Sequence, residues 1–312
     1  MKNIIETSNI TKKFGNLTAV NEVNLQVKEG EIFGFLGPNG AGKTTTISML
    51  TTLMKPTSGS AMVAGYDIVK DASYVRSAIG VVPQSFSLFP ELTAEENLAY
   101  IGKLYGMKDS VIKERTVSLL RTVALYEHKS RISGAFSGGM KQRLSVAASI
   151  MSNPKVLFMD EPTTGLDPQS RIAIRELTRN LNKSGITILY TTHDMEEADK
   201  LCDRIAIMDK GSIIALGTSD EIKRTMKAGH LVEVELEYPS KEIISELKKM
   251  HYVTSVHQND RFLNIKVNQK EGIFFKLSDF FSRKRQKVLE IRIKEYSLED
   301  VFINLTKKDL RD

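Results

Sequence analysis

The segment Gly37–Thr44, Gly-Pro-Asn-Gly-Ala-Gly-Lys-Thr, constrains the fold of this chain more than any other stretch. It fits the pattern G-x-x-x-x-G-K-[ST] at every fixed position. An apolar run over Ile32–Leu36 predicts a buried strand before it, and residues 45–54 predict a helix after it. Glycines let the loop turn its N–H groups inward, and the helix N-terminus adds about half a positive charge. The segment therefore predicts a phosphate-binding site in an α/β fold.

The last two residues of this segment carry its chemistry. The Lys43 ammonium would neutralise the β- and γ-phosphate oxygens, and the Thr44 hydroxyl would occupy one coordination position on Mg²⁺. The alternative is a glycine-rich turn that contains a lysine by chance. The strand before the loop and the helix after it are the context that the pattern requires, so we adopt nucleotide binding as the interpretation.

Two adjacent carboxylates follow a second apolar strand. Residues 156–159 are apolar, and Asp160 and Glu161 come directly after them. Ligands of α/β sheets bind beyond the carboxyl ends of the strands, so both carboxylates are expected to face the phosphates. Asp160 would hold Mg²⁺ through water, and Glu161 would polarise the water that attacks the γ-phosphate. The alternative is a strand capped by acidic residues that have no catalytic role.

Three further residues each have two interpretations. Phe14 lies in a polar loop, and it either folds back into the core or offers a flat surface on which adenine stacks. Gln84 ends a short apolar strand, and it is either an ordinary loop residue or one that reaches Mg²⁺ or the attacking water. His193 follows a buried strand, and it is either structural or contacts the γ-phosphate and holds Glu161 in place.

A helical insert at about residues 85–150 divides the strand-rich part of the chain. Thr93 and Glu96 form a predicted capping box at its first helix. Near its end, Ser137-Gly138-Gly139 opens a helix that runs toward Ile150, and such an N-terminus is again an anion site. A flexible linker is the alternative, which the apolar helical positions that follow disfavour. The sequence therefore predicts two phosphate sites in one chain.

Composition limits the classes of function. The 312 residues suggest about two domains, and the net charge of +6 is too mild to support nucleic-acid binding. The basic cluster Arg283–Lys287 is interpreted as a solvated helix end. The single cysteine, Cys202, excludes an internal disulfide and suits a reducing compartment. The sequence has no apolar run of about 18 residues and no signal-peptide core, so we expect a chain that neither spans a membrane nor is exported.

Over about residues 3–220 the chain resembles the ATP-binding cassette ATPases. The motifs that carry the resemblance occur in the family's order and spacing: Phe14, Gly37–Thr44, Gln84, Phe136–Gly139, Asp160-Glu161, Gly165-Leu166-Asp167 and His193. Phe136 stands where leucine is common and Met140 where glutamine is common, but the phosphate-facing residues between them are intact. Phe14 lacks the hydroxyl of the more usual tyrosine, which stacking does not require.

The resemblance implies an α/β fold, with a P-loop NTPase cassette over residues 1–229 that contains an antiparallel β subdomain and the helical insert. It implies ATP and Mg²⁺ as cofactors. By the resemblance, Glu161, His193 and Gln84 are catalytic, and Thr44, Gln84 and Asp160 hold the metal. The residues that it implies around the nucleotide are Phe14, Gly37, Pro38, Asn39, Gly40, Ala41, Gly42, Lys43, Thr44, Thr45, Ser137, Gly138, Gly139 and Asp167.

The family's arrangement gives the second phosphate site a purpose. Two cassettes meet head to tail, and the phosphate loop of one and Ser137–Gly139 of the other enclose each ATP. The implied partners are a second copy of this chain and integral membrane transporter subunits, at the cytoplasmic face of the cell membrane. ATP closes the pair and hydrolysis opens it, and the helical insert passes the motion to the membrane partner.

Residues 230–312 predict a second, smaller domain. Their order of elements is β-α-β-β-α-β, which suggests a ferredoxin-like α+β unit, followed by a closing helix. The closing helix carries an apolar stripe, formed by Leu298, Val301, Phe302 and Leu305. The stripe packs either on its own unit or against the cassette or a second subunit. This ending is similar to that of the daunorubicin-resistance type of cassette subunits.

The leading hypothesis is an ATP-hydrolysing subunit that energises an export transporter with separate membrane subunits. A soluble regulatory cassette ATPase and an import-type ATPase are the alternatives. Cassette ATPases that act on ribosomes or DNA are disfavoured, because this chain has one cassette and a short gap between the phosphate loop and Ser137.

Overall fold

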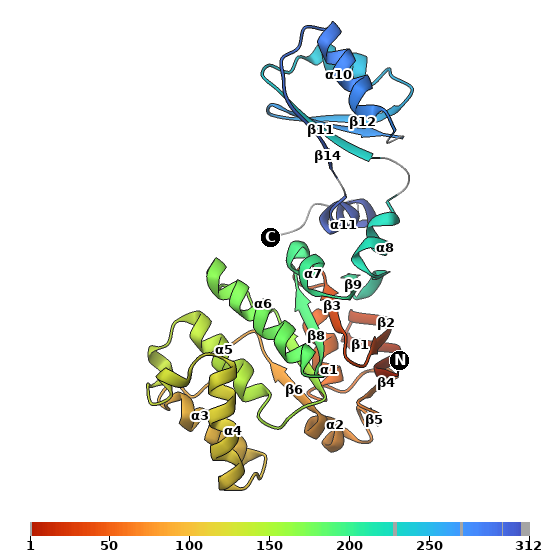
Figure 1. Ribbon diagram of the computed structural model, residues 1–312. Coiled ribbons are helices and arrows are strands. Elements are labelled where there is room, and N and C mark those ends of the chain that lie inside the picture. Colours follow the sequence, from red (N-terminus) through yellow and green to blue (C-terminus); the bar gives the residue numbers. More distant parts are fainter. Residues whose placement is uncertain (1, 227–229, 269–270, 295, 307–312) are drawn as a thin grey trace. The chain divides into compact units, whose positions relative to one another are not determined.

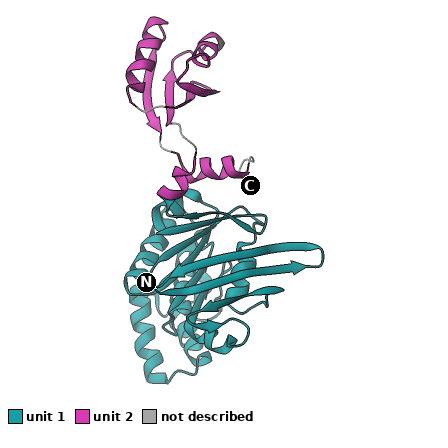
Figure 2. Ribbon diagram, turned by 90° about the vertical axis from the view of Figure 1, so that its right-hand side faces the viewer, with its two compact units in different colours: residues 1–219, 310–312 teal, residues 220–309 magenta. Residues whose placement is uncertain are grey.

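The computed structural model describes residues 2–226, 230–268, 271–294 and 296–306. The chain divides into two compact units between Ser219 and Asp220 (Figure 2). The sequence places the domain boundary at residues 229 and 230, where the first strand of the second unit begins. The two boundaries differ because the short helix α8 (Ser219–Arg224) belongs to the second unit from Asp220 onward.

A six-stranded sheet forms the centre of the first unit (Figure 1). Its order is β10-β9-β3-β8-β7-β6, and β10 alone runs antiparallel to its neighbour. The strands are β3 (Ile32–Leu36), β6 (Ile79–Val82), β7 (Val156–Asp160), β8 (Thr187–Thr192), β9 (Arg204–Asp209) and β10 (Ser212–Gly217). Every residue of β3, β7 and β8 is buried, as expected for parallel strands that are covered on both faces.

The two faces of this sheet belong to two hydrophobic cores. Along β7, Leu157 and Met159 join the core that the helical segment completes, whereas Val156 and Phe158 join the core beneath an antiparallel sheet. Successive side chains of a strand point to opposite faces, so one apolar run supplies both cores. Because β3, β8 and β7 are neighbours that run parallel, their carboxyl ends lie at one edge of the sheet.

The antiparallel sheet has the order β2-β1-β4-β5. Its strands are β1 (Asn3–Phe14), β2 (Leu17–Lys28), β4 (Ser58–Val63) and β5 (Tyr66–Asp67). The sequence predicts one strand over residues 60–68, which is wrong, because the chain reverses at Ala64 and Gly65, both with positive φ of 54° and 87°. The helix α2 (Ala72–Ala78), which follows this hairpin, was not predicted.

Three helices make up the insert between β6 and β7. They are α3 (Ala94–Leu104), α4 (Asp109–Thr122) and α5 (Gly138–Ser149), with two short 3₁₀ turns at Tyr126–His128 and Ser133–Ala135. The predicted capping box is present, because the Thr93 side chain accepts from the Glu96 N–H and Glu96 accepts from the Thr93 N–H. Helix α3 packs against α4 and α5.

The remaining helices of the first unit are α1 (Lys43–Leu50), α6 (Pro168–Lys183) and α7 (Met195–Leu201). Helix α7 packs close to β3, where a Cβ added at Gly34 would lie 2.8 Å from the Cys202 Sγ. Any larger residue at this position of the strand would have to displace the Cys202 side chain. Burial raises the pKa of the Cys202 thiol well above its ordinary value.

The second unit contains a four-stranded antiparallel sheet of order β12-β13-β11-β14. Its elements, in the predicted β-α-β-β-α-β order, are β11 (His230–Leu236), α9 (Lys241–Leu247), β12 (Val253–Asn259), β13 (Phe262–Val267), α10 (Ile273–Arg283) and β14 (Val288–Lys294). Both helices supply side chains to one core with the sheet, among them Leu247 and Leu277. The helix α11 (Leu298–Thr306) follows, and of its predicted stripe only Leu305, at 42% exposed, is not buried.

Candidate active site

The phosphate-binding loop connects the end of β3 to the start of α1. Gly42 at the N-cap of α1 has a φ of 107°, and a Cβ there would lie 2.5 Å from the Ala19 carbonyl oxygen. Only glycine tolerates both the left-handed backbone and this close approach. The loop conformation therefore explains the fixed glycine of the pattern before Lys43.

Lys43 is buried under the loop. Its Nζ donates to the carbonyl oxygens of Gly37 at 2.7 Å and Pro38 at 3.2 Å, and it forms an ion pair with the Glu161 Oε1 at 3.1 Å. A buried ammonium requires such partners, because desolvation is costly for an unpaired charge. The contact joins the phosphate-binding loop directly to the predicted catalytic carboxylate.

Glu161 follows the last residue of β7 and has a φ of 45°, in the left-handed region. Its carboxylate also contacts the His193 Nδ1 at 3.1 Å and accepts from the Thr164 hydroxyl at 3.2 Å. Burial alone would raise the pKa of Glu161, but the charge and hydrogen bond of Lys43, with His193 and Thr164, hold this pKa below its ordinary value. Glu161 is therefore ionised at neutral pH, the form that accepts a proton.

Asp160 and His193 come to this place from neighbouring strands. Asp160 ends β7 and is buried, and its Oδ1 accepts a hydrogen bond from the Thr191 hydroxyl at 2.6 Å. His193 follows β8, which pairs with β7, so that its ring reaches Glu161 as the sequence predicts. The parallel pairing of two strands thus brings three predicted site residues together.

A cavity of about 320 Å³ opens beside the loop. Its lining residues are Phe14, Leu17, Ala19, Asn39, Gly40, Ala41, Gly42, Lys43, Thr44, Thr45, Gln84 and Glu161. Phe14 is 45% exposed at this cavity, so of its two interpretations the buried one is wrong. Leu17 and Ala19 were not singled out from the sequence; they follow Phe14 in the same hairpin, and Leu17 pairs with it.

Six predicted nucleotide residues are not in the lining of this cavity, as the described part of the chain forms it. Gly37 and Pro38 belong to the loop itself, and their carbonyl oxygens accept from the Lys43 Nζ. The other four belong to different segments. Ser137 is the N-cap of α5 and accepts from the Met140 N–H at 3.3 Å, with Gly138 and Gly139 in the first turn. Asp167 is the N-cap of α6 and accepts from the Ser170 N–H at 2.9 Å. Within one chain they do not complete the site of Lys43 and Glu161.

A layer of buried polar groups behind the site was not predicted. Glu197 of α7 is 3% exposed, and its Oε2 accepts hydrogen bonds from the hydroxyls of Thr163 at 2.9 Å and Thr192 at 3.1 Å. Thr163 follows the Glu161 segment and Thr192 precedes His193. Glu197 therefore links the backbone segments that carry the two side chains.

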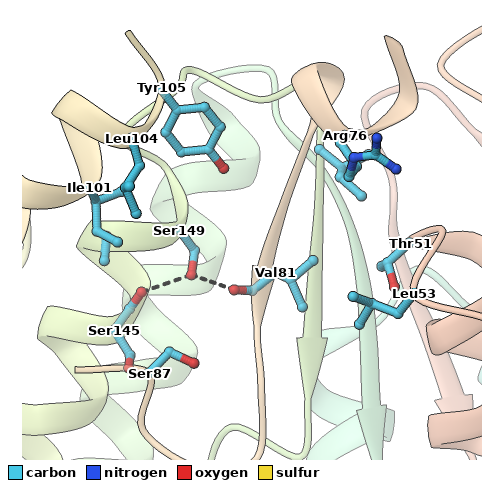
Figure 3. Close-up of a pocket in the computed structure, with 12 residues that line it drawn as sticks. Thr51, Leu53, Arg76, Val81, Ser87, Ile101, Leu104, Tyr105, Ser145 and Ser149 are labelled. Atoms are coloured by element: carbon cyan, nitrogen blue, oxygen red, sulfur yellow. Dashed lines mark hydrogen bonds between the residues drawn. The ribbon is translucent and has the colours of Figure 1, made fainter. Parts of the chain in front are cut away.

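A second, larger hollow of about 500 Å³ lies where β6 meets the insert (Figure 3). We refer to it as the insert groove. The residues that line it are Thr51, Leu53, Arg76, Ile79, Val81, Ser87, Ile101, Leu104, Tyr105, Ser145, Ala148 and Ser149. The Ser149 hydroxyl bonds to the carbonyl oxygens of Val81 at 2.6 Å and Ser145 at 2.8 Å, which ties α5 to β6 along its floor. Leu53 and Leu104 at its rim are 76% and 66% exposed.

Comparison with known proteins identifies the family. The model of the ABC transporter family matches residues 20–164. The linearmycin resistance ATP-binding protein LnrL of Bacillus subtilis is 38% identical over 99% of this chain and 100% of its own length. The daunorubicin/doxorubicin resistance ATP-binding protein DrrA of Streptomyces peucetius is 37% identical over 97% of this chain and 92% of its own. The chain belongs to the ATP-binding cassette transporter ATPases.

Solved structures of this family match about seven tenths of the chain. The ATP-binding subunit of an ABC transporter has a TM-score of 0.64 and 31% identity, over 71% of this chain and 92% of its own. The ATP-binding cassette MJ0796, in a dimeric post-hydrolysis form bound to ADP and Pi, has a TM-score of 0.62 and 30% identity, over 69% of this chain and 98% of its own. The cassette fold and its activity as a transport-coupled ATPase follow from this membership. Within the described ranges, no helix is long and apolar enough to cross a membrane.

Proposed function

We propose that this chain is the ATP-hydrolysing subunit of an export transporter whose membrane subunits are separate chains. The observation that carries the proposal is the joint contact of Lys43 and His193 with the Glu161 carboxylate, at a cavity that the phosphate-binding loop lines. A phosphate-binding cation, a general base and a histidine that holds the base are the groups that hydrolysis of a terminal phosphate requires.

The cavity fits a nucleotide. Backbone N–H groups of the loop and the N-terminus of α1 would hold the phosphates, and the exposed Phe14 ring would stack on adenine. The Lys43 ammonium would exchange its ion pair with Glu161 for the β- and γ-phosphate oxygens. Binding of the nucleotide would thereby release one oxygen of the Glu161 carboxylate.

The donor set beside the loop fits a magnesium ion. Thr44 and Gln84 line the cavity and Asp160 adjoins Glu161, so a hydroxyl, an amide and a carboxylate supply the oxygen ligands that Mg²⁺ prefers. When bound, the ion would neutralise charge on the β- and γ-phosphates. Glu161, held by His193 and ionised at neutral pH, would accept the proton of the attacking water.

A head-to-tail dimer would complete each site. Ser137, Gly138 and Gly139 begin a helix outside their own chain's cavity, and Asp167 begins another. In a dimer these N-termini would face the nucleotide on the partner's loop. The dimeric form of the related cassette MJ0796 supports this arrangement.

We assign the insert groove to the membrane subunit. It is lined mostly by apolar side chains and adjoins the segment after Gln84, so a helix docked there would sense the occupancy of the nucleotide site. Export is favoured over the import-type and soluble regulatory alternatives because the full-length relatives LnrL and DrrA are named as resistance proteins. We further propose that the cassette domain spans residues 1–229 and the accessory domain residues 230–312. The chain would lie at the cytoplasmic face of the cell membrane, where its membrane subunits are.

The composite site can be tested with two inactive variants. Ser137→Arg should leave ATP binding nearly intact and abolish hydrolysis, because a bulky cation fills the space for the partner's γ-phosphate. Lys43→Ala should lose binding at its own loop. A mixture should regain activity, since a mixed dimer pairs one intact loop with one intact Ser137. Mixed dimers that form and stay inactive would contradict composite sites.

The partner can be tested by purifying this chain from membranes and identifying the integral protein that accompanies it. A transporter subunit is the expected result. Recovery of the chain without any integral protein, under conditions that preserve its ATPase activity, would favour the soluble regulatory alternative.

A further inference from the structure

Thr191 lies directly behind the two carboxylates of the site. It is fully buried in β8, opposite Asp160 in the pairing of β7 with β8. Its hydroxyl donates to the Asp160 Oδ1 at 2.6 Å and accepts from the Glu161 N–H at 2.9 Å. One hydroxyl therefore contacts both residues that the proposed mechanism needs.

The Thr191 hydroxyl donates its hydrogen bond to Asp160. The Met159 carbonyl oxygen is a second acceptor at 3.4 Å, but the carboxylate is closer and charged, and charge-assisted bonds are the shorter and stronger ones. With Oδ1 held, the Asp160 carboxylate cannot rotate freely. Its other oxygen stays available for a metal-bound water.

The same hydroxyl stabilises the backbone of Glu161. The left-handed conformation of this residue, φ 45°, is unfavourable for a non-glycine residue and needs support from its surroundings. The Glu161 N–H is shared between the Thr191 hydroxyl and the Thr191 carbonyl oxygen, at 2.9 and 3.2 Å. These bonds fix the direction in which the Glu161 side chain leaves the strand.

We propose that Thr191 is a positioning residue, whose hydroxyl orients Asp160 toward the metal and Glu161 toward the attacking water. The inference rests on the proposed roles of Asp160 and Glu161. It predicts that loss of the hydroxyl weakens metal binding and turnover together, whereas nucleotide binding without metal is retained.

The test compares Thr191→Val, which keeps the shape and loses the hydroxyl, with Thr191→Ser, which keeps the hydroxyl. Thr187→Val is the matched control, because Thr187 is fully buried in the same strand and its hydroxyl accepts from the Gly30 N–H at 2.9 Å, away from the carboxylates. Thr191→Ala replaces the valine variant if that variant does not fold. The readouts are Mn²⁺ binding by electron paramagnetic resonance at saturating non-hydrolysable ATP analogue, nucleotide affinity without metal, and kcat.

Thr191→Val should bind Mn²⁺ about 10- to 100-fold more weakly and lose kcat over a similar range, as expected when an outer-shell partner is removed. Thr191→Ser should restore most of both, and Thr187→Val should change neither by more than about twofold.

Asp160→Asn tests the proposed role of Asp160 separately from that of Thr191. If Asp160→Asn does not weaken Mn²⁺ binding, the proposed metal-holding role of Asp160 fails. If Asp160→Asn weakens Mn²⁺ binding and the folded Thr191→Val or Thr191→Ala protein binds Mn²⁺ like the parent, the inference about Thr191 alone is overturned.

Discussion

Three neighbouring groups hold Glu161 in place. Lys43 holds one carboxylate oxygen and His193 the other, while the backbone N–H is fixed from β8. In the proposed mechanism Lys43 leaves this carboxylate for the phosphates, whereas the contacts from His193 and from β8 remain and keep Glu161 in place. A change in its chemistry that keeps its shape should separate binding from hydrolysis.

Glu161→Gln should keep ATP binding and lower kcat by about 100-fold or more, because the amide preserves the shape of the carboxylate but is no base. The unhydrolysed ATP should then hold the dimer together. The measurements are ATPase turnover, nucleotide affinity and sizing with ATP and Mg²⁺. Glu114→Gln, an exposed change on α4, is the control and should behave as the parent. Parental turnover, or a monomer with ATP and Mg²⁺, would refute this role of Glu161.

The motif residues of the site could be predicted from the sequence, because their spacing is fixed by chemistry within a short segment. The contributions of Thr191 and Glu197 could not. A threonine in a strand is an ordinary β-branched residue, and its hydroxyl gains a function only through the register of β7 against β8. The buried Glu197 likewise gives no local signal, since its partners Thr163 and Thr192 come from other elements.

Among the elements, the sequence predicts those with a long repeating pattern of apolar residues. Elements whose ends are determined by a turn were missed. Helix α5 begins at the predicted segment Ser137–Gly139, with Ser137 as its side-chain cap. Helix α6 begins at Pro168 after the Asp167 cap, three residues before Arg171, where the sequence predicts its start. The hairpin of β4 and β5 reverses at Ala64, which has a left-handed conformation. Alanine rarely adopts this conformation, so the residue gives no sequence signal for the turn. Helix α2 carries only two buried residues, Val75 and Ala78, which are too few to form a recognisable helical pattern of apolar residues.

Helix α3 offers a test of the insert groove. Leu104→Glu places a charge at an exposed apolar residue of the groove and should weaken recovery of the membrane subunit by about tenfold or more, since the buried charge would be unpaired. ATPase activity of the isolated chain should stay near the parental value. Ile132→Glu is the matched control, 51% exposed in the same insert and outside the groove. Equal recovery with both variants would exclude this groove as the docking site.

At the scale of the whole molecule, the cassette and the second unit are two compact units with separate hydrophobic cores. The solved cassettes match about 92–98% of their own lengths with only 69–71% of this chain, so related cassettes occur without such a second unit. The second unit has a core of its own, formed by its sheet and the helices α9 and α10. Its contribution is therefore expected in assembly or coupling.

Removing residues 230–312 should leave ATP affinity almost unchanged, within about twofold, and alter dimerisation or transport coupling. The reason is that the residues proposed to hold ATP, the loop and Phe14, all belong to the first unit. The checks are nucleotide binding, sizing with ATP, and export in cells. A truncated chain that dimerises, hydrolyses ATP and supports export like the full chain would show that the second unit is dispensable.

The close packing of Cys202 against Gly34 has a practical consequence for labelling experiments. This thiol is the only one in the sequence, and its raised pKa lowers the fraction of reactive thiolate at neutral pH. We therefore expect Cys202 to react more slowly with maleimides and disulfide reagents than an exposed cysteine does. A cysteine introduced at an exposed position should therefore be labelled first, and a spin label or fluorophore placed there would report opening and closing of the proposed dimer.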